Sequence, residues 1–157
     1  MRAKHVFRYF LVPLGIVFLL CLGVRLLPPL QPGRLGLIDG KLNACPESPN
    51  CVSSESLDEQ HQVTPLPFSG DADDALQRVI EVVGAMPRTQ LISQKNNYLH
   101  FECRSRLFRF VDDLEFYVDP ERHVIQVRSA SRVGYSDLGV NRKRVEKVRE
   151  ALLAKGL

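Results

Sequence analysis

The chain has 157 residues, enough for one domain of ordinary size and an appended segment. Hydrophobic residues make up 45% of it, which excludes disorder along the whole length. The net charge of +3 comes from an acid-free N-terminal stretch, and the 17 basic and 18 acidic residues after position 27 give no indication of a nucleic-acid-binding protein.

Residues 1–27 are predicted to be a transmembrane signal anchor. Between Arg8 and Arg25 lie 16 uncharged residues, which as a helix would cover about 24 Å of a hydrocarbon core roughly 30 Å thick. Leu26 and Leu27 extend the stretch, and arginines at both ends argue against a buried core helix. A cleaved signal peptide is the alternative, but no small-x-small cleavage site follows closely.

The charges around this segment predict its orientation. Arg2, Lys4 and Arg8 precede the apolar run, so the positive-inside rule places the N-terminus in the cytoplasm. The rest of the chain is then expected to be periplasmic or otherwise extracytoplasmic, in a single-pass protein whose first partner is the membrane.

Residues 28–70 are predicted to be an extended, loop-rich lead-in, because they hold seven prolines and few periodic apolar runs. Cys45 and Cys51 lie in CPESPNC, and an exported protein can bridge them with a disulfide. Free thiols are one alternative. A zinc site with His61 is another, but a fourth ligand and the short C-x-x-C spacing are missing. Cys103 lies in an apolar alternation and is expected to be a small core residue.

Residues 71–157 are predicted to form an α+β domain of two layers. Asp71 is expected to cap a helix that ends before Pro87, and Asn141 is expected to cap a closing helix. Between them, alternation and turn residues predict a four-stranded antiparallel meander flanked by the two helices. The expected strands are 90–95, 98–104, 107–118 and 123–133, with turns at 96–97, 105–106 and 119–122.

The turns also predict the register. A loop at 119–122 pairs Phe116 with Ile125 and sets Asp113 against Arg128 on the other face. The same register sets Arg109 against Arg132, and a turn at 105–106 places Glu102 opposite Arg109. Both hairpins assign the same faces, one aromatic and aliphatic and the other charged.

The charged face has two interpretations. It is either a solvated surface with weak cross-strand ion pairs or a site for an anion such as a carboxylate, phosphate or lipid headgroup. Basic residues at the start of the closing helix favour the second, because a helix start otherwise prefers acids. The hypothetical binding residues are Arg109, Asp113, Arg128, Arg132, Tyr135, Asp137, Asn141 and Arg142.

Asp112 is expected on the apolar face opposite Ser129, so both are interpreted as structural polar residues. A buried carboxylate needs hydrogen-bond or cationic partners. A β-bulge at Asp112-Asp113 is the alternative explanation.

Catalytic interpretations are weaker. Asp112 and Asp113 point to opposite faces of a strand, and so do His100 and Cys103, so neither pair can act as a simple dyad. The sequence has no phosphate-binding glycine loop and no dinucleotide fingerprint, and no cofactor or metal is expected. An envelope hydrolase or transferase using Asp113, Glu115 or His100 with the arginines remains an alternative, as does a structural or assembly protein.

Three motifs resemble the bacterial and plastid family called domain of unknown function 1499. They are CPESPNCVSS at 45–54 with the nearby His61 and Pro65-Leu66, FVDDLEF at 110–116, and RSASRVGYSDLGVNRKRVE at 128–146. The resemblance covers about residues 34–155. It implies a membrane-associated or exported protein without an established activity, and it supplies no catalytic residue. The leading hypothesis is therefore a membrane-tethered, non-enzymatic domain that binds an anionic ligand or an envelope protein.

Overall fold

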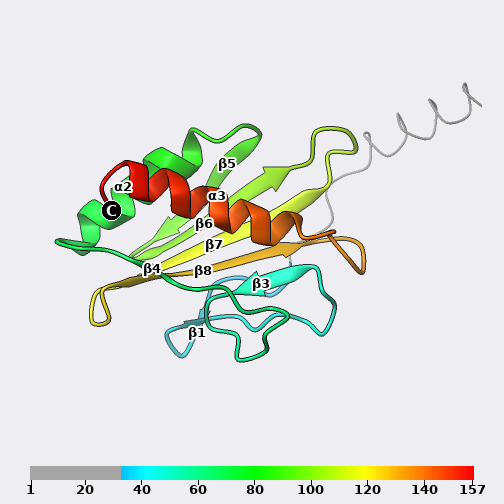
Figure 1. The fold of residues 1–157 in the computed structure, drawn as a ribbon, viewed down its shortest axis with the longest axis horizontal. Helices are drawn as coiled ribbons and strands as arrows, with labels where there is room; N and C mark the ends of the chain where they lie inside the picture. The colour runs from blue at the N-terminus through cyan, green and yellow to red at the C-terminus, as the bar shows by residue number, and fades with distance from the viewer. Residues whose placement is uncertain (1–32) are drawn as a thin grey trace, which may run out of the picture.

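Four consecutive segments with alternating side-chain character form the predicted antiparallel meander (Figure 1). They are β5 (Thr89–Lys95), β6 (Tyr98–Arg104), β7 (Val111–Asp119) and β8 (Val124–Ser131). The turn at 96–97 is confirmed, since Lys95 pairs with Tyr98. A bulge between Leu91 and Ser93 takes Ile92 out of the β5 ladder and leaves it 45% exposed.

The structure is a computed structural model that describes residues 33–157. The predicted membrane anchor, residues 1–27, lies outside the described residues. Within the described part, no helix combines the length and the apolar character needed to cross a membrane.

The sheet has six strands, so the expectation of four was wrong. β3 (Cys51–Ser53) and β4 (Leu66–Pro67) both pair with the outer edge of β8, and both come from the predicted lead-in. They satisfy backbone groups of β8 that would otherwise form an open edge. The lead-in also forms a small hairpin of β1 (Leu37–Ile38) and β2 (Lys41–Leu42).

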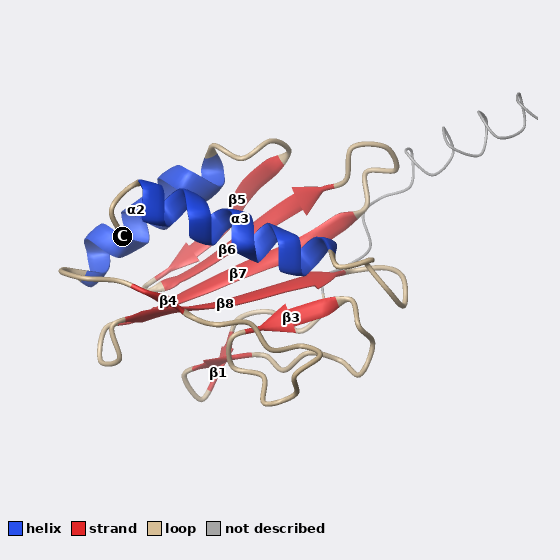
Figure 2. Cartoon of the chain, in the orientation of Figure 1, coloured by secondary structure: helices blue, strands red, loops and turns tan. Residues whose placement is uncertain are grey.

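Both helices pack on one face of the sheet, which confirms the two-layer α+β architecture (Figure 2). α2 (Ala72–Gly84) begins at its predicted cap, where the Asp71 carboxylate accepts from the Asp73 and Asp74 amides. α3 (Val140–Ala154) begins one residue before Asn141, so the predicted cap was wrong. The Asp137 carboxylate instead accepts from the amides of Gly139 and Asn141 at 2.9 and 2.7 Å.

The core lies between this face and the helices. Phe101 and Phe116 meet edge to face with their ring centroids 6.0 Å apart, and both are fully buried. Val83 of α2 and Val148 of α3 are also fully buried in the same cluster. The apolar periodicity of the sequence therefore identified the core face correctly.

The predicted registers were wrong, but the predicted faces are confirmed. Phe116 pairs with Val127, so the β7–β8 register is displaced by two residues. β6 and β7 are joined by six residues, 105–110, and their register is displaced by four. Even displacements leave each side chain on its face because the strand period is two. Consequently Arg109 lies in a loop, at φ 58°, and opposite neither Arg132 nor Glu102.

A disulfide joins Cys45 and Cys51, with their Cα atoms 5.6 Å apart, as predicted. Because both sulfur atoms belong to the disulfide, neither cysteine can serve as a thiolate ligand of the alternative zinc site. The bridge fixes the segment that precedes β3 next to that strand, which in turn pairs with β8. Cys103 is buried, in agreement with its predicted place in the core.

Candidate functional site

The second face of the sheet carries a layer of buried and half-buried charged and polar side chains, called here the polar face. Its members come from alternate positions of β6, β7 and β8, plus Arg132 just beyond β8. They are Tyr98, His100, Glu102, Arg104, Asp113, Glu115, Arg128 and Arg132. Glu115 is 0% exposed and Asp113 2%, so this is not the solvated surface that alternation alone would suggest.

Glu115 is the centre of one half of this layer. Its carboxylate accepts from Tyr98 Oη at 2.8 Å, from the Gly36 amide at 2.9 Å and from Arg128 Nη1 at 2.6 Å. Burial and then the charge of Glu115 raise the pKa of Tyr98 far above its usual range, so the phenol keeps its proton. The Gly36 contact ties the lead-in to the middle of the sheet.

Asp113 is the centre of the other half. Arg132 donates to it from Nε at 2.9 Å and from Nη2 at 2.7 Å, and His100 Nε2 lies 2.7 Å from its Oδ1. Burial acts to raise the pKa of Asp113, but the hydrogen bonds from Arg132 and His100 outweigh it, and the net pKa is lowered. Arg132 Nη2 also donates to Glu102 at 2.7 Å, and Arg104 donates to the other Glu102 oxygen at 2.8 Å.

A separate polar cluster lies on the helix side of the sheet, where α3 begins. Asp112 is 7% exposed and receives a hydrogen bond from Arg144 Nη2. Arg144 also donates to Ser129 Oγ at 2.9 Å, and Ser129 donates to the Asn141 side-chain oxygen at 2.6 Å. Asp112 thus has the cationic partner that its burial requires. The ladders of β7 contain no bulge, and Asp112 pairs with Ser131 instead of Ser129.

The lead-in covers part of the polar face and leaves a cavity of about 370 Å³ beneath it, called here the Arg128 cavity. Arg34 and Asn43 line it from the lead-in, and Asp113, Arg128 and Arg132 line it from the sheet. Arg34 is exposed, and it makes no ion pair with any residue of 33–157. Three arginines and one carboxylate thus line this cavity, and Glu115 and Glu102, which pair with Arg128 and Arg132, do not line it.

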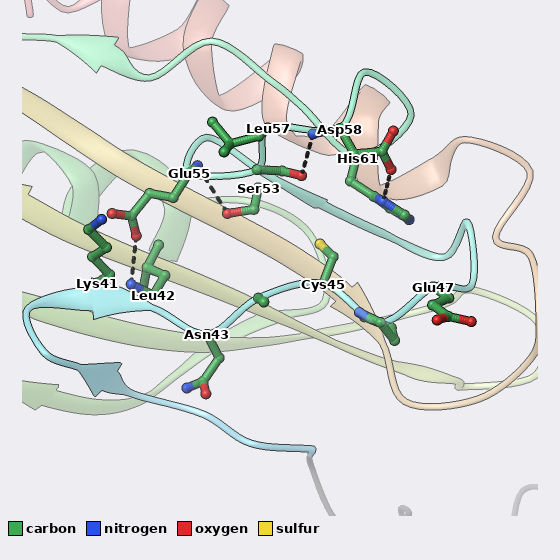
Figure 3. A pocket seen from close by; sticks show the side chains of 13 residues that line it. Lys41, Leu42, Asn43, Cys45, Glu47, Ser53, Glu55, Leu57, Asp58 and His61 are labelled. Atoms are coloured by element: carbon green, nitrogen blue, oxygen red, sulfur yellow. Dashed lines mark hydrogen bonds and ion pairs between the residues drawn. The ribbon is translucent and has the colours of Figure 1, made fainter.

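A second cavity, of about 540 Å³, lies between β2 and the turn that follows β3 (Figure 3). The Glu55 carboxylate accepts from the Leu42 amide at 2.6 Å, and His61 Nδ1 lies 2.6 Å from Asp58 Oδ2 (Figure 3). His61 Nε2 faces the Ser48 carbonyl at 3.2 Å. These bonds hold the turn against the earlier residues 42–48 of the lead-in. Within 33–157 no three His, Cys, Asp or Glu side chains gather as metal ligands.

The eight predicted binding residues do not form one site. The polar face carries Asp113, Arg128 and Arg132. The first turn of α3, over the opposite face, carries Asn141 and Arg142. The β8–α3 loop contains Tyr135 and Asp137, and the β6–β7 loop contains Arg109. Arg142 donates to the carbonyls of Gln62 and Gln60 at 2.7 and 2.9 Å. Tyr135 is 76% exposed, and Asp137 caps α3.

Sequence reasoning missed Arg34 as part of the cavity, and it missed Arg144 as the partner of Asp112. For Arg144 a signal was present, because a basic residue in a first helical turn needs an acidic partner. For Arg34 there was none, since nothing in the sequence relates the lead-in to the sheet face that it covers.

The model of a family described as "Protein of unknown function (DUF1499)" matches residues 41–152. No curated protein matches the chain.

Proposed function

The chain belongs to the DUF1499 family, and we propose that it is a membrane-tethered, exported domain that binds a small anionic molecule without transforming it. The proposed ligand carries a carboxylate or a phosphate, and the proposed site is the Arg128 cavity. The observation that carries the proposal is the unused hydrogen-bonding capacity of Arg128.

Only one of the three guanidinium nitrogens of Arg128 donates a hydrogen bond to a residue of 33–157. Nη1 donates to Glu115, whereas Nε is buried without an acceptor and Nη2 donates to none of the residues 33–157. Nε–H and Nη2–H of a guanidinium lie side by side and match the two oxygens of a carboxylate or phosphate. A buried donor without an acceptor costs about 1–3 kcal/mol, and a ligand oxygen at this edge would recover that energy.

The charges around Arg128 favour an anion over a cation or a neutral ligand. Arg34 and Arg132 also line the cavity, and Asp113 is the one carboxylate among the described residues that does so. Glu115 fixes the Arg128 head group in place before any ligand arrives, which lowers the entropy cost of binding.

The ionisation of the polar face supports binding over acid–base catalysis. Hydrogen bonds from Arg132 and His100 lower the pKa of Asp113, whereas a general acid needs a raised pKa. Cys103 offers no nucleophile to His100, because the two lie on opposite faces of β6 and burial raises the pKa of the thiol. These features make the hydrolase or transferase alternative the weaker one.

Native mass spectrometry of the full chain, extracted gently from its own membrane, tests the proposal. Arg128→Lys keeps a cation opposite Glu115 but removes the Nε and Nη2 fork. Arg122→Lys is the matched control, since Arg122 is an exposed arginine near Asp119, with 3.7 Å between Nε and Oδ2, and it does not line the cavity.

We expect an anionic adduct on the wild type and on Arg122→Lys that is lost from Arg128→Lys. Titration with inorganic phosphate and with succinate should then give an affinity at least about tenfold weaker for Arg128→Lys, as expected for one charged bidentate contact. An adduct that survives in Arg128→Lys would refute the site. A bare wild type that neither probe stabilises would refute the function and favour a structural or assembly role.

A further inference from the structure

The loop between β6 and β7, residues 105–110, combines exposed apolar and basic side chains. Leu107 is 62% exposed, Phe108 40% and Phe110 46%. The two phenyl rings stack on each other, with centroids 5.5 Å apart and 23° between their planes. Exposed apolar side chains this close together indicate an interaction surface, because on the surface of a soluble protein such side chains are normally isolated from one another.

The loop has a defined shape of its own. Ser105 N donates to the Phe110 carbonyl, and Phe110 N donates to Ser105 Oγ, both at 2.9 Å, so its two ends are joined. Arg109 adopts a left-handed conformation at φ 58°. The aromatic side chains are therefore presented to solvent from a closed loop.

Basic side chains surround the same loop. Arg88, Arg104, Arg106 and Arg109 line a cavity of about 480 Å³ whose other lining residues are Thr89, Gln90 and Ser105, with no carboxylate. Arg104 pairs with Glu102 on the polar face. Within the described residues, Arg106 and Arg109 form no ion pair. No carboxylate among the residues that line this cavity balances their charge.

The loop lies at the end of the sheet where the described chain begins. β6 ends and β8 ends at this side, and Arg132, just after β8, donates its amide to the Val111 carbonyl next to the loop (Figure 1). Gly33 lines the same cavity as Arg132. The predicted anchor ends at residue 27, and six residue steps can bridge at most about 20 Å. With the proposed anchor in the membrane, a tether of that length would keep this end of the domain near the bilayer, so the inference rests on the membrane anchoring in the proposed function.

We propose that residues 105–110, with Arg88 and Arg104 beside them, dock on an anionic membrane surface. Phe108 and Phe110 enter the boundary between headgroups and acyl chains, and Arg106 and Arg109 contact lipid phosphates. Aromatic side chains favour this boundary, and basic side chains next to it attract anionic lipids. The surface is distinct from the Arg128 cavity, and docking does not depend on a ligand there.

The absence of tryptophan from the chain makes the test direct. Phe108→Trp puts a single fluorescent reporter on the loop. Leu153→Trp is the control reporter, because Leu153 is 57% exposed near the end of α3, and Figure 1 places the C-terminus at the opposite end of the sheet. The full-length chain is reconstituted in vesicles of phosphatidylcholine with 30 mol% phosphatidylglycerol, with and without brominated acyl chains.

We expect a blue shift and bromine quenching of Phe108→Trp, and neither for Leu153→Trp. Adding Arg106→Gln and Arg109→Gln should weaken the loop's association by about 25-fold, at about fivefold for each arginine. Pure phosphatidylcholine or high salt should reduce the quenching in the same way. Equal spectra for the two reporters would overturn the proposal. Quenching that is equally strong without the two arginines would also overturn it, and a blue shift that needs added membrane proteins would overturn it in favour of a protein partner.

Discussion

The ion pair between Glu115 and Arg128 provides the strictest test of how the polar face is held together. Glu115 is 0% exposed, and the Arg128 side chain is 7% exposed, so neither charge can be solvated when its partner is removed. Breaking a buried pair by changing one member costs about 3–5 kcal/mol, because an uncompensated charge stays inside the protein. Glu115→Gln keeps an acceptor for Tyr98 and Gly36, so the cost that it reports is mainly electrostatic.

The double variant separates this cost from lost packing. Arg128→Met alone should cost a similar amount, since it leaves the Glu115 carboxylate buried without a cation. Glu115→Gln combined with Arg128→Met removes both charges, and its cost should fall at least about 2 kcal/mol below the sum of the two single costs.

Guanidinium denaturation of the full chain in mild detergent, followed by far-ultraviolet circular dichroism, measures these free energies of unfolding. Glu81→Gln is the control, because its 3.2 Å ion pair with Lys155 is exposed on both sides and should contribute less than about 1 kcal/mol. Single costs below about 1 kcal/mol, or strictly additive costs, would refute a buried, coupled pair.

Three further predictions concern other parts of the domain. Asp137→Ala should cost about 1 kcal/mol by removing the cap of α3, whereas Asp137→Asn should cost less; equal melting temperatures for wild type and Asp137→Ala would contradict this. Hydrogen bonds from Arg132 and His100 lower the pKa of Asp113, although burial acts to raise it. The ionised Asp113 carboxylate therefore stabilises the fold fully above about pH 4, and this stabilisation is lost as the pH falls through the lowered pKa. Thermal melts of Asp113→Asn should accordingly depend less on pH between about pH 5 and 2 than those of the wild type, and parallel curves would refute the assignment. Replacing Cys45 and Cys51 together with Ser should cost about 2–3 kcal/mol on the chain-entropy model, and an unchanged melting temperature would show that the bridge adds nothing.

Periodicity predicted the elements and the faces of this fold, because each depends on a local pattern. Val145, Val148 and Leu152 recur at helical spacing, and all three are fully buried. Phe101 and Phe116 alternate with polar neighbours and lie on the core face. The assignment of side chains to faces stays correct when the predicted register is displaced by an even number of residues.

The register and the edge strands could not be predicted, because they depend on contacts beyond the local pattern. The loop 105–110 is closed by Ser105 Oγ and by an Arg109 conformation that sequence alone does not reveal. β3 and β4 are too short to show a period, and β3 pairs with β8 across more than 70 residues. Ion-pair partners such as Asp112 and Arg144 are likewise fixed by packing, so the sequence predicted the need for a partner but not its identity.

The attachment of the lead-in to the polar face also has a mechanical meaning. A pull on the domain through its N-terminal side would enter at residue 33 and meet the Gly36–Glu115 hydrogen bond first. The hairpin of β1 and β2 would open next, one ladder at a time. The Cys45–Cys51 bridge would then pass the load to β3 and across its hydrogen bonds to β8, so the lead-in could yield while the sheet kept its shape.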